Sequence, residues 1–152
     1  MNQKGLTLLE LIIVMVIIAI GAVLTTPNIS GWLPNYRLRN ATKDVASIMR
    51  LAQIKAVSTN TPFRVSFNAL NDSYVLEYQT TAGWVAEGGN QTLPTGVKFN
   101  TDFGNVAIFS SNSTATDAGG NVILNGNITL NNTKGSTKKV CLLGLTGRIK
   151  IE

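Results

Sequence analysis

The residue best placed to do chemistry is Glu10, because it is an acid inside an otherwise apolar stretch. From Leu6 to Leu24 the chain has 19 residues, and all of them except Thr7, Glu10 and Gly21 are apolar. A carboxylate near the middle of a bilayer costs about 2.5–3.5 kcal/mol on insertion scales. An acid in such a stretch therefore indicates a function and a partner of opposite charge.

A cut after Gly5 would create that partner. Leu6 would become the first residue, with a positive α-amine, and Glu10 the fifth, so that both lie on one helix face. At ~4 Å such a pair is worth only about 1 kcal/mol in water and far more in a low-dielectric medium. If copies pack side by side, Glu10 could neutralise the amine of a neighbour and fix the axial register. The alternative is an ordinary signal-anchor in which the acid has no role.

The motif Lys4-Gly5-Leu6-Thr7-Leu8-Leu9-Glu10, followed by a long apolar run, resembles the class III leader of type IV pilins and type II secretion pseudopilins. The resemblance implies a prepilin peptidase that cuts between Gly5 and Leu6. It further implies methylation of the new amine on Leu6, where the family usually has Phe. Glu10 would be the acid needed for subunit assembly.

The same stretch predicts an anchor in the membrane. A helix from Leu6 to Leu24 would rise about 29 Å, which nearly matches the hydrocarbon core. No small-x-small cleavage site follows it closely, so we expect it to stay on the mature protein. Lys4 precedes the stretch and the next bases, Arg37 and Arg39, lie well beyond it. We predict a single-pass protein of the bacterial inner membrane, with its N-terminus cytoplasmic and its C-terminal domain periplasmic.

The composition argues against catalysis. The chain has no His, which excludes a Ser-His or Cys-His pair and removes the commonest zinc ligand. With only eight acids, we predict no enzyme activity, metal or cofactor. Cys141 is the only cysteine, so no intrachain disulfide can form, and we interpret it as a small buried hydrophobe rather than a redox or intermolecular thiol. The formal net charge of +5 is compatible with acidic partners without requiring them.

Beyond the anchor, hydrophobic periodicity predicts an amphipathic helix over residues 31–59. Pro27 and Pro34 predict kinks rather than a stop, since the helical pattern resumes after them. We interpret the bases as a solvated face, although Arg50 and Lys55 could also pair with acids of neighbouring subunits. The apolar positions recur at three and four residues and consist of Leu38, Ala41, Val45, Ile48, Met49, Ala52 and Ala56.

From Thr61 the period changes to two, which predicts antiparallel sheet. Residues 63–67 and 74–78 alternate around a turn and predict a hairpin lying on the helix. Composition predicts a mobile loop between Ser110 and Asn121. Further short strands are expected at 84–86, 97–99, 106–109, 122–124, 128–130, 139–143 and 148–151.

The predicted fold class is therefore α+β, a long N-terminal helix packed on an antiparallel β-sheet domain. We divide the chain into a leader to be removed, a membrane-spanning and filament-core helix segment, an amphipathic helix segment and a globular β domain. These cover residues 1–5, 6–30, 31–59 and 60–152.

The tail narrows the resemblance. Phe109 with the Ser/Gly-rich loop, Gly126–Leu130 and Lys139–Lys150 are together similar to the C-terminal pattern of the GspH/FimT family. That family contains minor pseudopilin H of type II secretion and the FimT/FimU minor pilins. The resemblance implies a two-sheet globular domain in a structural subunit near the tip of a pseudopilus or pilus. Its partners would be other pilins and an inner-membrane assembly platform. The sequence does not decide between secretion and pilus.

The C-terminal residues also suggest a second function, DNA binding. Some FimT-like members bind DNA through a C-terminal Gly-Arg-x-Arg element, and this chain has Gly147-Arg148-Ile149-Lys150. The last 19 residues hold five of the 13 bases and one acid. Such a cluster would contact phosphates without reading sequence. Alternatively, Arg148 and Lys150 are merely the outward positions of a terminal strand. The candidate DNA-binding residues are Arg148, Lys150, Lys138 and Lys139.

Overall fold

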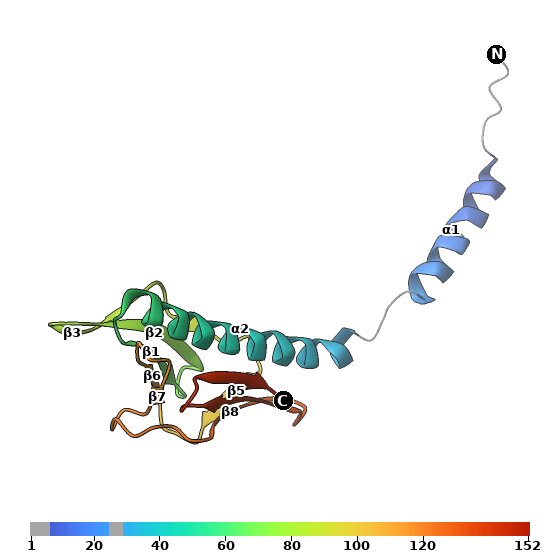
Figure 1. The fold of residues 1–152 in the computed structure, drawn as a ribbon. Coiled ribbons are helices and arrows are strands. Elements are labelled where there is room, and N and C mark those ends of the chain that lie inside the picture. The colour runs from blue at the N-terminus through green and yellow to red at the C-terminus, as the bar shows by residue number, and fades with distance from the viewer. Residues whose placement is uncertain (1–6, 25–28) are drawn as a thin grey trace, which may run out of the picture. The chain divides into compact units, whose positions relative to one another are not determined.

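The computed structural model describes residues 7–24 and 29–152 (Figure 1). The chain divides after Leu33 into two compact units. Helix α1 (Leu8–Leu24) belongs to the first unit, and most of helix α2 (Ile29–Thr59) belongs to the second. Gly5, Leu6 and Pro27 lie outside the described residues.

Helix α2 passes through Pro34 without a break, as predicted, and ends at Thr59. Asn60 follows with φ 51°, in the left-handed region that commonly ends a helix and that Asn tolerates. The end of the helix is thus set by a local conformation.

The globular unit contains two antiparallel sheets, which confirms the two-sheet prediction. The first has the order β3-β2-β1-β6-β7, with β4 also paired to β2, and the second has the order β10-β9-β8-β5. The strands are β1 (Phe63–Asn68), β2 (Ser73–Thr80), β3 (Gly83–Ala86), β4 (Gln91–Thr92), β5 (Val97–Thr101), β6 (Val106–Phe109), β7 (Ala115–Thr116), β8 (Gly126–Asn132), β9 (Thr137–Leu143) and β10 (Arg148–Ile151).

The core lies where α2 meets the inner faces of the sheets. The predicted stripe of α2 is buried, with only Ile48 partly so, and five of its residues are 0% exposed. Three of these stripe residues are Ala, which lets the helix approach the strands closely. From the sheets, Val65, Phe109 and Leu130 contribute fully buried side chains to the same cluster. Burial of one such large side chain stabilises the fold by about 1.5–3 kcal/mol.

The hairpin prediction is confirmed by the pairing of β1 with β2. Phe63 lies opposite Tyr78 and Phe67 opposite Tyr74, so the inward aromatic residues form cross-strand pairs. Asn68 closes the turn, because its side-chain oxygen accepts hydrogen bonds from the N–H groups of Leu70 and Asn71.

One local prediction was wrong. Residues 122–124 form no strand, because Val122 makes only an isolated bridge with Thr116 and only Ile123 is buried. The segment from Ser110 to Asn121, for which the composition predicts a mobile loop, contains β7 and a hydrogen-bonded turn. In that turn Asp117 accepts hydrogen bonds from the N–H groups of Gly119 and Asn121.

Candidate functional site

Glu10 lies in the first turn of α1, and Thr7 caps that turn. The Thr7 hydroxyl accepts a hydrogen bond from the Glu10 N–H at 3.3 Å, and the Thr7 carbonyl accepts one from the Leu11 N–H at 3.2 Å. Thr-x-x-Glu is the spacing of a capping box, and an acid here is also favoured by the positive end of the helix dipole. The sequence carried this signal, but our sequence reasoning did not use it. The hydrogen bond to Thr7 uses the backbone N–H of Glu10, so its carboxylate favours the start of α1 through the helix dipole.

Helix α1 is apolar around its whole circumference. Its exposed fractions within this chain range from 49% at Val14 to 78% at Leu8 among the large apolar side chains. A helix that is apolar on every side is normally buried by lipid or by other helices. No helix in the described part of the chain has the length and apolar character that crossing a membrane requires.

The C-terminal bases lie mainly on one face of the second sheet. In β10, Arg148 and Lys150 are exposed while Ile149 is 9% exposed, which confirms the predicted alternation. Lys150 lies opposite Cys141 in β9. Lys139 is two residues before Cys141 and therefore lies on the same outer face of the sheet. Lys138 is two residues before the buried Val140 and lies on the same face of β9 as that residue. The structure therefore places it on the opposite face from the other three candidates.

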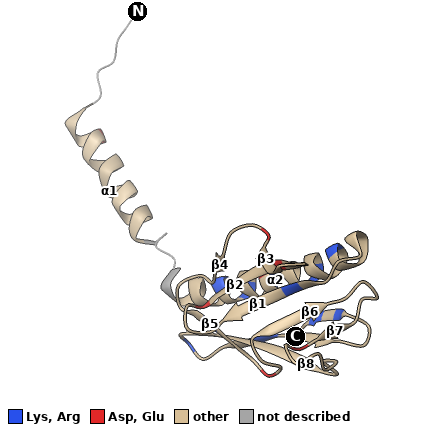
Figure 2. Cartoon of the chain, turned by 90° about the vertical axis from the view of Figure 1, so that its left-hand side faces the viewer, with Lys and Arg blue, Asp and Glu red and all other residues tan. Residues whose placement is uncertain are grey.

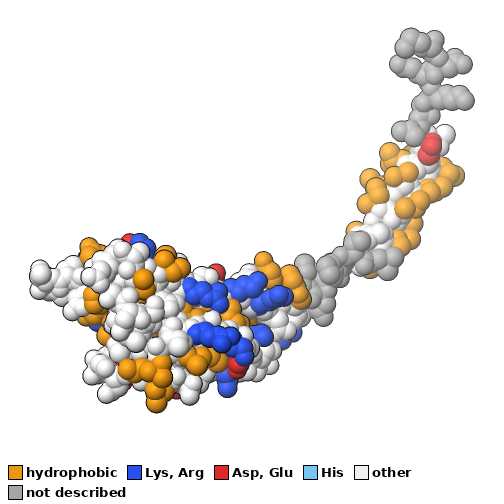
Figure 3. Space-filling view, in the orientation of Figure 1, with side chains coloured by type: hydrophobic (Ala, Val, Ile, Leu, Met, Phe, Trp, Pro, Cys, Tyr) orange, Lys and Arg blue, Asp and Glu red, His pale blue; other side chains and the backbone are white. Residues whose placement is uncertain are grey.

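Sequence reasoning missed a fourth base on this outer face. Lys98 in β5 lies opposite Asn131 in β8, and Asn131 lies opposite Thr137 in β9. Thr137 is two residues before Lys139 and lies on the same outer face. Residues opposite one another in a sheet share a face, so Lys98 also lies on the outer face. The alternation of Val97-Lys98-Phe99 was visible in the sequence, but its place beside β8 depends on strand register. We call Arg148, Lys150, Lys139 and Lys98 the basic face. Figures 2 and 3 show where basic residues gather over α2 and the strands near the C-terminus.

An acid partly neutralises the basic face. Lys150 Nζ lies 2.7 Å from Glu152 Oε1, and both side chains are more than half exposed. The hydrogen bond between them raises the pKa of Lys150 and lowers the pKa of Glu152. An exposed pair of this kind contributes little to stability, yet it removes one charge from the face.

Cys141 is only partly buried, which corrects the prediction of a buried hydrophobe. Strand register places it on the outer face of β9, between Lys150 and Asn127, while its neighbours Val140 and Leu142 point into the core. Desolvation, and after it the Glu152 carboxylate, raise the pKa of its thiol. The thiol is therefore protonated and weakly reactive at neutral pH.

Contacts with α2 fix the position of β10. Arg50 donates a hydrogen bond to the carbonyl of Ile149 at 3.3 Å. Gly147 packs so closely against Gln53 and the carbonyl oxygen of Ser113 that an added Cβ would overlap both. Lys55 pairs with Glu87 of the same chain. Both Arg50 and Lys55 thus already have partners within this chain.

The described residues contain no group of three or more His, Cys, Asp or Glu side chains that could hold a metal ion. The Asp117 carboxylate accepts hydrogen bonds from Asn121 and from backbone N–H groups, and these lower its pKa. Its oxygens are thus engaged by donors of the turn itself.

Two family models match the chain. The prokaryotic N-terminal methylation motif matches residues 1–26. The model of the type II transport protein GspH matches residues 41–146, which is most of the globular unit. The chain belongs to the GspH family. This confirms the resemblance drawn from the leader and the tail. The two matches together support the role of a membrane-anchored structural subunit of a pilus or pseudopilus.

Individual relatives agree with this assignment. The type II secretion system protein H of Xanthomonas campestris pv. campestris is 36% identical to this GspH-family chain over 61 residues. The match covers 40% of this chain and only 36% of that relative.

Two solved structures share the fold. The minor pseudopilin EpsH from the type 2 secretion system of Vibrio cholerae has a TM-score of 0.64 at 12% identity, covering 76% of this chain and 96% of that one. The type IV minor pilin FimU of Pseudomonas aeruginosa has a TM-score of 0.61 at 12% identity, covering 78% of this chain and 90% of that one. These likenesses confirm the α+β fold with its helix on antiparallel sheets.

Proposed function

We propose that this GspH-family protein is a structural subunit of a type II secretion pseudopilus or a type IV pilus, and that it assembles through its N-terminal helix. The observation that supports this most directly is α1, which is exposed and apolar on all sides and has one acid in its first turn. Such a helix needs an apolar environment, and a filament core of packed helices would provide one.

The proposal includes processing. A prepilin peptidase would cut between Gly5 and Leu6, and the new amine on Leu6 would be methylated. The match of residues 1–26 to the N-terminal methylation motif supports both steps. Residues 6–30 would then be the membrane and filament-core segment, 31–59 the amphipathic segment, and 60–152 the globular domain.

Before assembly, the protein would sit in the bacterial inner membrane as a single-pass protein, with its N-terminus cytoplasmic and its globular domain periplasmic. An assembly platform in that membrane and other pilins or pseudopilins would be its partners. The protein would do no chemistry of its own, in keeping with a family of structural subunits.

The variant Glu10→Gln tests the assembly role. Gln is accepted at this place in a capping box, so α1 should still begin at Leu8, while the charge is lost. We expect the variant to remain membrane-bound but to fall at least about tenfold in sheared filaments, because a charge pair in low dielectric is worth more than ~1 kcal/mol. Glu10→Asp keeps the charge and serves as the control. Incorporation of Glu10→Gln at the wild-type level would refute the pairing.

Mass spectrometry of the mature N-terminus tests the processing. The expected N-terminus is Leu6 with a methylated amine. A mature chain that begins at Met1, or that is released into solution after export, would contradict the proposal.

A second candidate function is DNA binding. It is favoured by one specific observation, that four bases of the basic face lie on one surface of the second sheet. Such a surface would contact phosphates, so affinity should fall steeply with salt. We would titrate duplex DNA with the full chain in detergent in a mobility-shift assay.

Arg148→Ala combined with Lys139→Ala should weaken this binding and reduce its salt dependence, because two phosphate contacts would be lost. Lys138→Ala removes a charge from the same strand but from its opposite face, so it should weaken DNA binding less. Salt-independent binding, or an equal loss in Lys138→Ala, would exclude the basic face as the DNA site.

A further inference from the structure

The segment from Glu87 to Gly96, which we call the strap, is fastened to α2 at two points. Lys55 Nζ pairs with Glu87 Oε1 at 2.5 Å near one end, and Arg37 donates to the Thr95 carbonyl at 3.1 Å near the other. Between these points β4 pairs with β2. The strap is therefore a fixed part of the fold.

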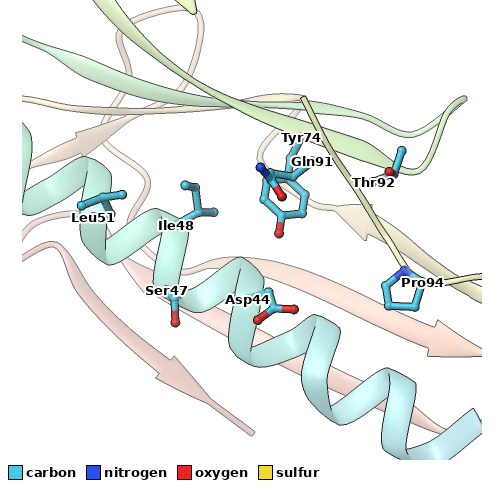
Figure 4. A pocket seen from close by; sticks show the side chains of 8 residues that line it. All are labelled: Asp44, Ser47, Ile48, Leu51, Tyr74, Gln91, Thr92 and Pro94. Atoms are coloured by element: carbon cyan, nitrogen blue, oxygen red, sulfur yellow. The ribbon is translucent and has the colours of Figure 1, made fainter. Parts of the chain in front are cut away.

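A groove with a volume of about 460 Å³ lies between α2 and the strap (Figure 4). Asp44, Ile48 and Leu51 line it from α2, and Pro94 lines it from the strap. Tyr74 of β2 lies at its centre in Figure 4, with its hydroxyl directed toward the side of Asp44. The groove therefore combines a polar end with an apolar wall.

The Asp44 carboxylate forms no ion pair with any described residue, although the chain carries 13 bases. On its own helix, the positions four residues away are Asn40 and Ile48, and neither is basic. The two bases of α2 that contact the strap already have partners there. Arg37 donates a hydrogen bond to the Thr95 carbonyl, and Lys55 pairs with Glu87. Asp44 is thus an exposed acid beside a groove, and no base in the described part of the chain pairs with it.

Tyr74 adds a second acceptor. It is 6% exposed, and its ring packs against Phe67 with centroids 6.4 Å apart. Burial, and after it the Asp44 charge, raise the pKa of its phenol, so it stays neutral at physiological pH. Its hydroxyl oxygen can then accept a hydrogen bond from a cation that also meets Asp44.

The apolar wall suits the stem of a long basic side chain. Leu51 is 40% exposed although it lines the groove, and Ile48 and Pro94 are partly buried beside it. Lys and Arg cover apolar surface with their methylene groups while the charged end reaches an acceptor. A small inorganic cation would leave this wall uncovered.

We propose that this groove binds a Lys or Arg side chain of a different pilin-like subunit that lies next to this one in the filament. The proposal rests on the proposed function, because it requires a neighbouring subunit. Charge complementarity at Asp44 would fix the register between the two globular domains. A different subunit is expected because a second copy of this chain would carry the same formal net charge of +5 and repel the first.

Photocrosslinking of the full chain in its host cells tests this. The photoreactive residue p-benzoylphenylalanine would replace Ser47, which lines the groove from α2, and in a second strain Gln91, which lines it from the strap. We expect both positions to crosslink to the same pilin-like subunit. The crosslinked peptide, identified by mass spectrometry, should contain a Lys or Arg.

Asp44→Asn should lower the yield of that crosslink at least fivefold. Asp72→Asn is the matched control, since Asp72 is an acid in the β1–β2 turn outside the groove, and Asn tolerates its φ of 45°. The control should stay within twofold of the parent. An unchanged yield in Asp44→Asn, a crosslink to a second copy of this chain, or a crosslinked peptide without a base would overturn the proposal.

The amount of this protein in the filament fraction separates the two possible failures. If the protein enters filaments in a Glu10-dependent way and Asp44→Asn leaves the crosslink unchanged, the groove proposal alone is wrong. If the protein never enters filaments, the proposed function is wrong and the groove proposal falls with it.

Discussion

Replacement of Gly147 by Ala tests how closely the turn before β10 packs against Gln53 of α2 and the backbone of Ser113. Gly147 has φ 63°, and a Cβ there would overlap the Gln53 side chain and the Ser113 carbonyl oxygen. The Gln53 side chain can rotate away, but the Ser113 oxygen belongs to the backbone and cannot. The turn between β9 and β10 would therefore have to move away from the segment between β6 and β7 that holds Ser113.

The magnitude has two parts. A left-handed conformation costs an Ala about 1–2 kcal/mol, and forcing extra volume into a packed site costs about 1–3 kcal/mol more. Gly135→Ala isolates the first part. Gly135 lies in the turn between β8 and β9 with φ 78°, and a Cβ there would meet nothing within 4 Å. We expect Gly147→Ala to be less stable than Gly135→Ala by about 1–3 kcal/mol.

Urea unfolding of the full chain in mild detergent, followed by circular dichroism, measures the difference. With a slope of about 1–3 kcal/mol per M, the midpoint of Gly147→Ala should lie roughly 1 M below that of Gly135→Ala. Displacement of the turn should also weaken the pairing of β10 with β9, which faster amide exchange at β10 would detect. Equal midpoints for the two variants would refute the close approach of this turn to Gln53 and Ser113.

Three further predictions concern the core and two titrating groups. Phe109→Ala, at a fully buried position of β6, should destabilise the globular unit by about 3–5 kcal/mol in urea unfolding, and a loss below 1 kcal/mol would contradict the two-sheet core. The pKa of Tyr74 is raised in the folded protein, so the neutral phenol contributes to stability below about pH 10, and this contribution is lost as pH rises through the folded-state value. Between about pH 9 and 11, the free energy of unfolding of Tyr74→Phe should therefore fall less than that of the wild type. The pKa of Asp117 is lowered, so its turn is stabilised above about pH 4 and weakens as pH falls through the folded-state value. The protection of the Gly119 and Asn121 amides, measured as observed exchange relative to the intrinsic rate at each pH, should therefore fall on acidification and change little in Asp117→Asn.

Much of the local structure could be predicted because its signals are local in the sequence. The spacing of apolar residues from Leu38 to Ala56 gave the buried stripe of α2, and alternation gave the β1–β2 hairpin and the terminal strand. The failure at residues 122–124 has the same origin. A run of Val, Ile and Leu resembles a strand, yet there a single Ile123 fills a gap in the core while its neighbours stay exposed.

The sequence by itself determined the N-terminal motif, with Glu10 five positions after Gly5, because this motif depends on residues close together in the chain. It also determined the family, whose model matches the order of residues over 41–146. Only the tertiary structure decided which bases share a surface. Lys139 and Lys138 are adjacent in sequence but opposite in parity, whereas Lys98 joins Lys139 through the register of β5, β8 and β9. It also decided that Lys55 has a partner within the chain and that Asp44 has no ion-pair partner among residues 7–24 and 29–152. Such pairings join residues far apart in the chain, and they are fixed by how the core packs.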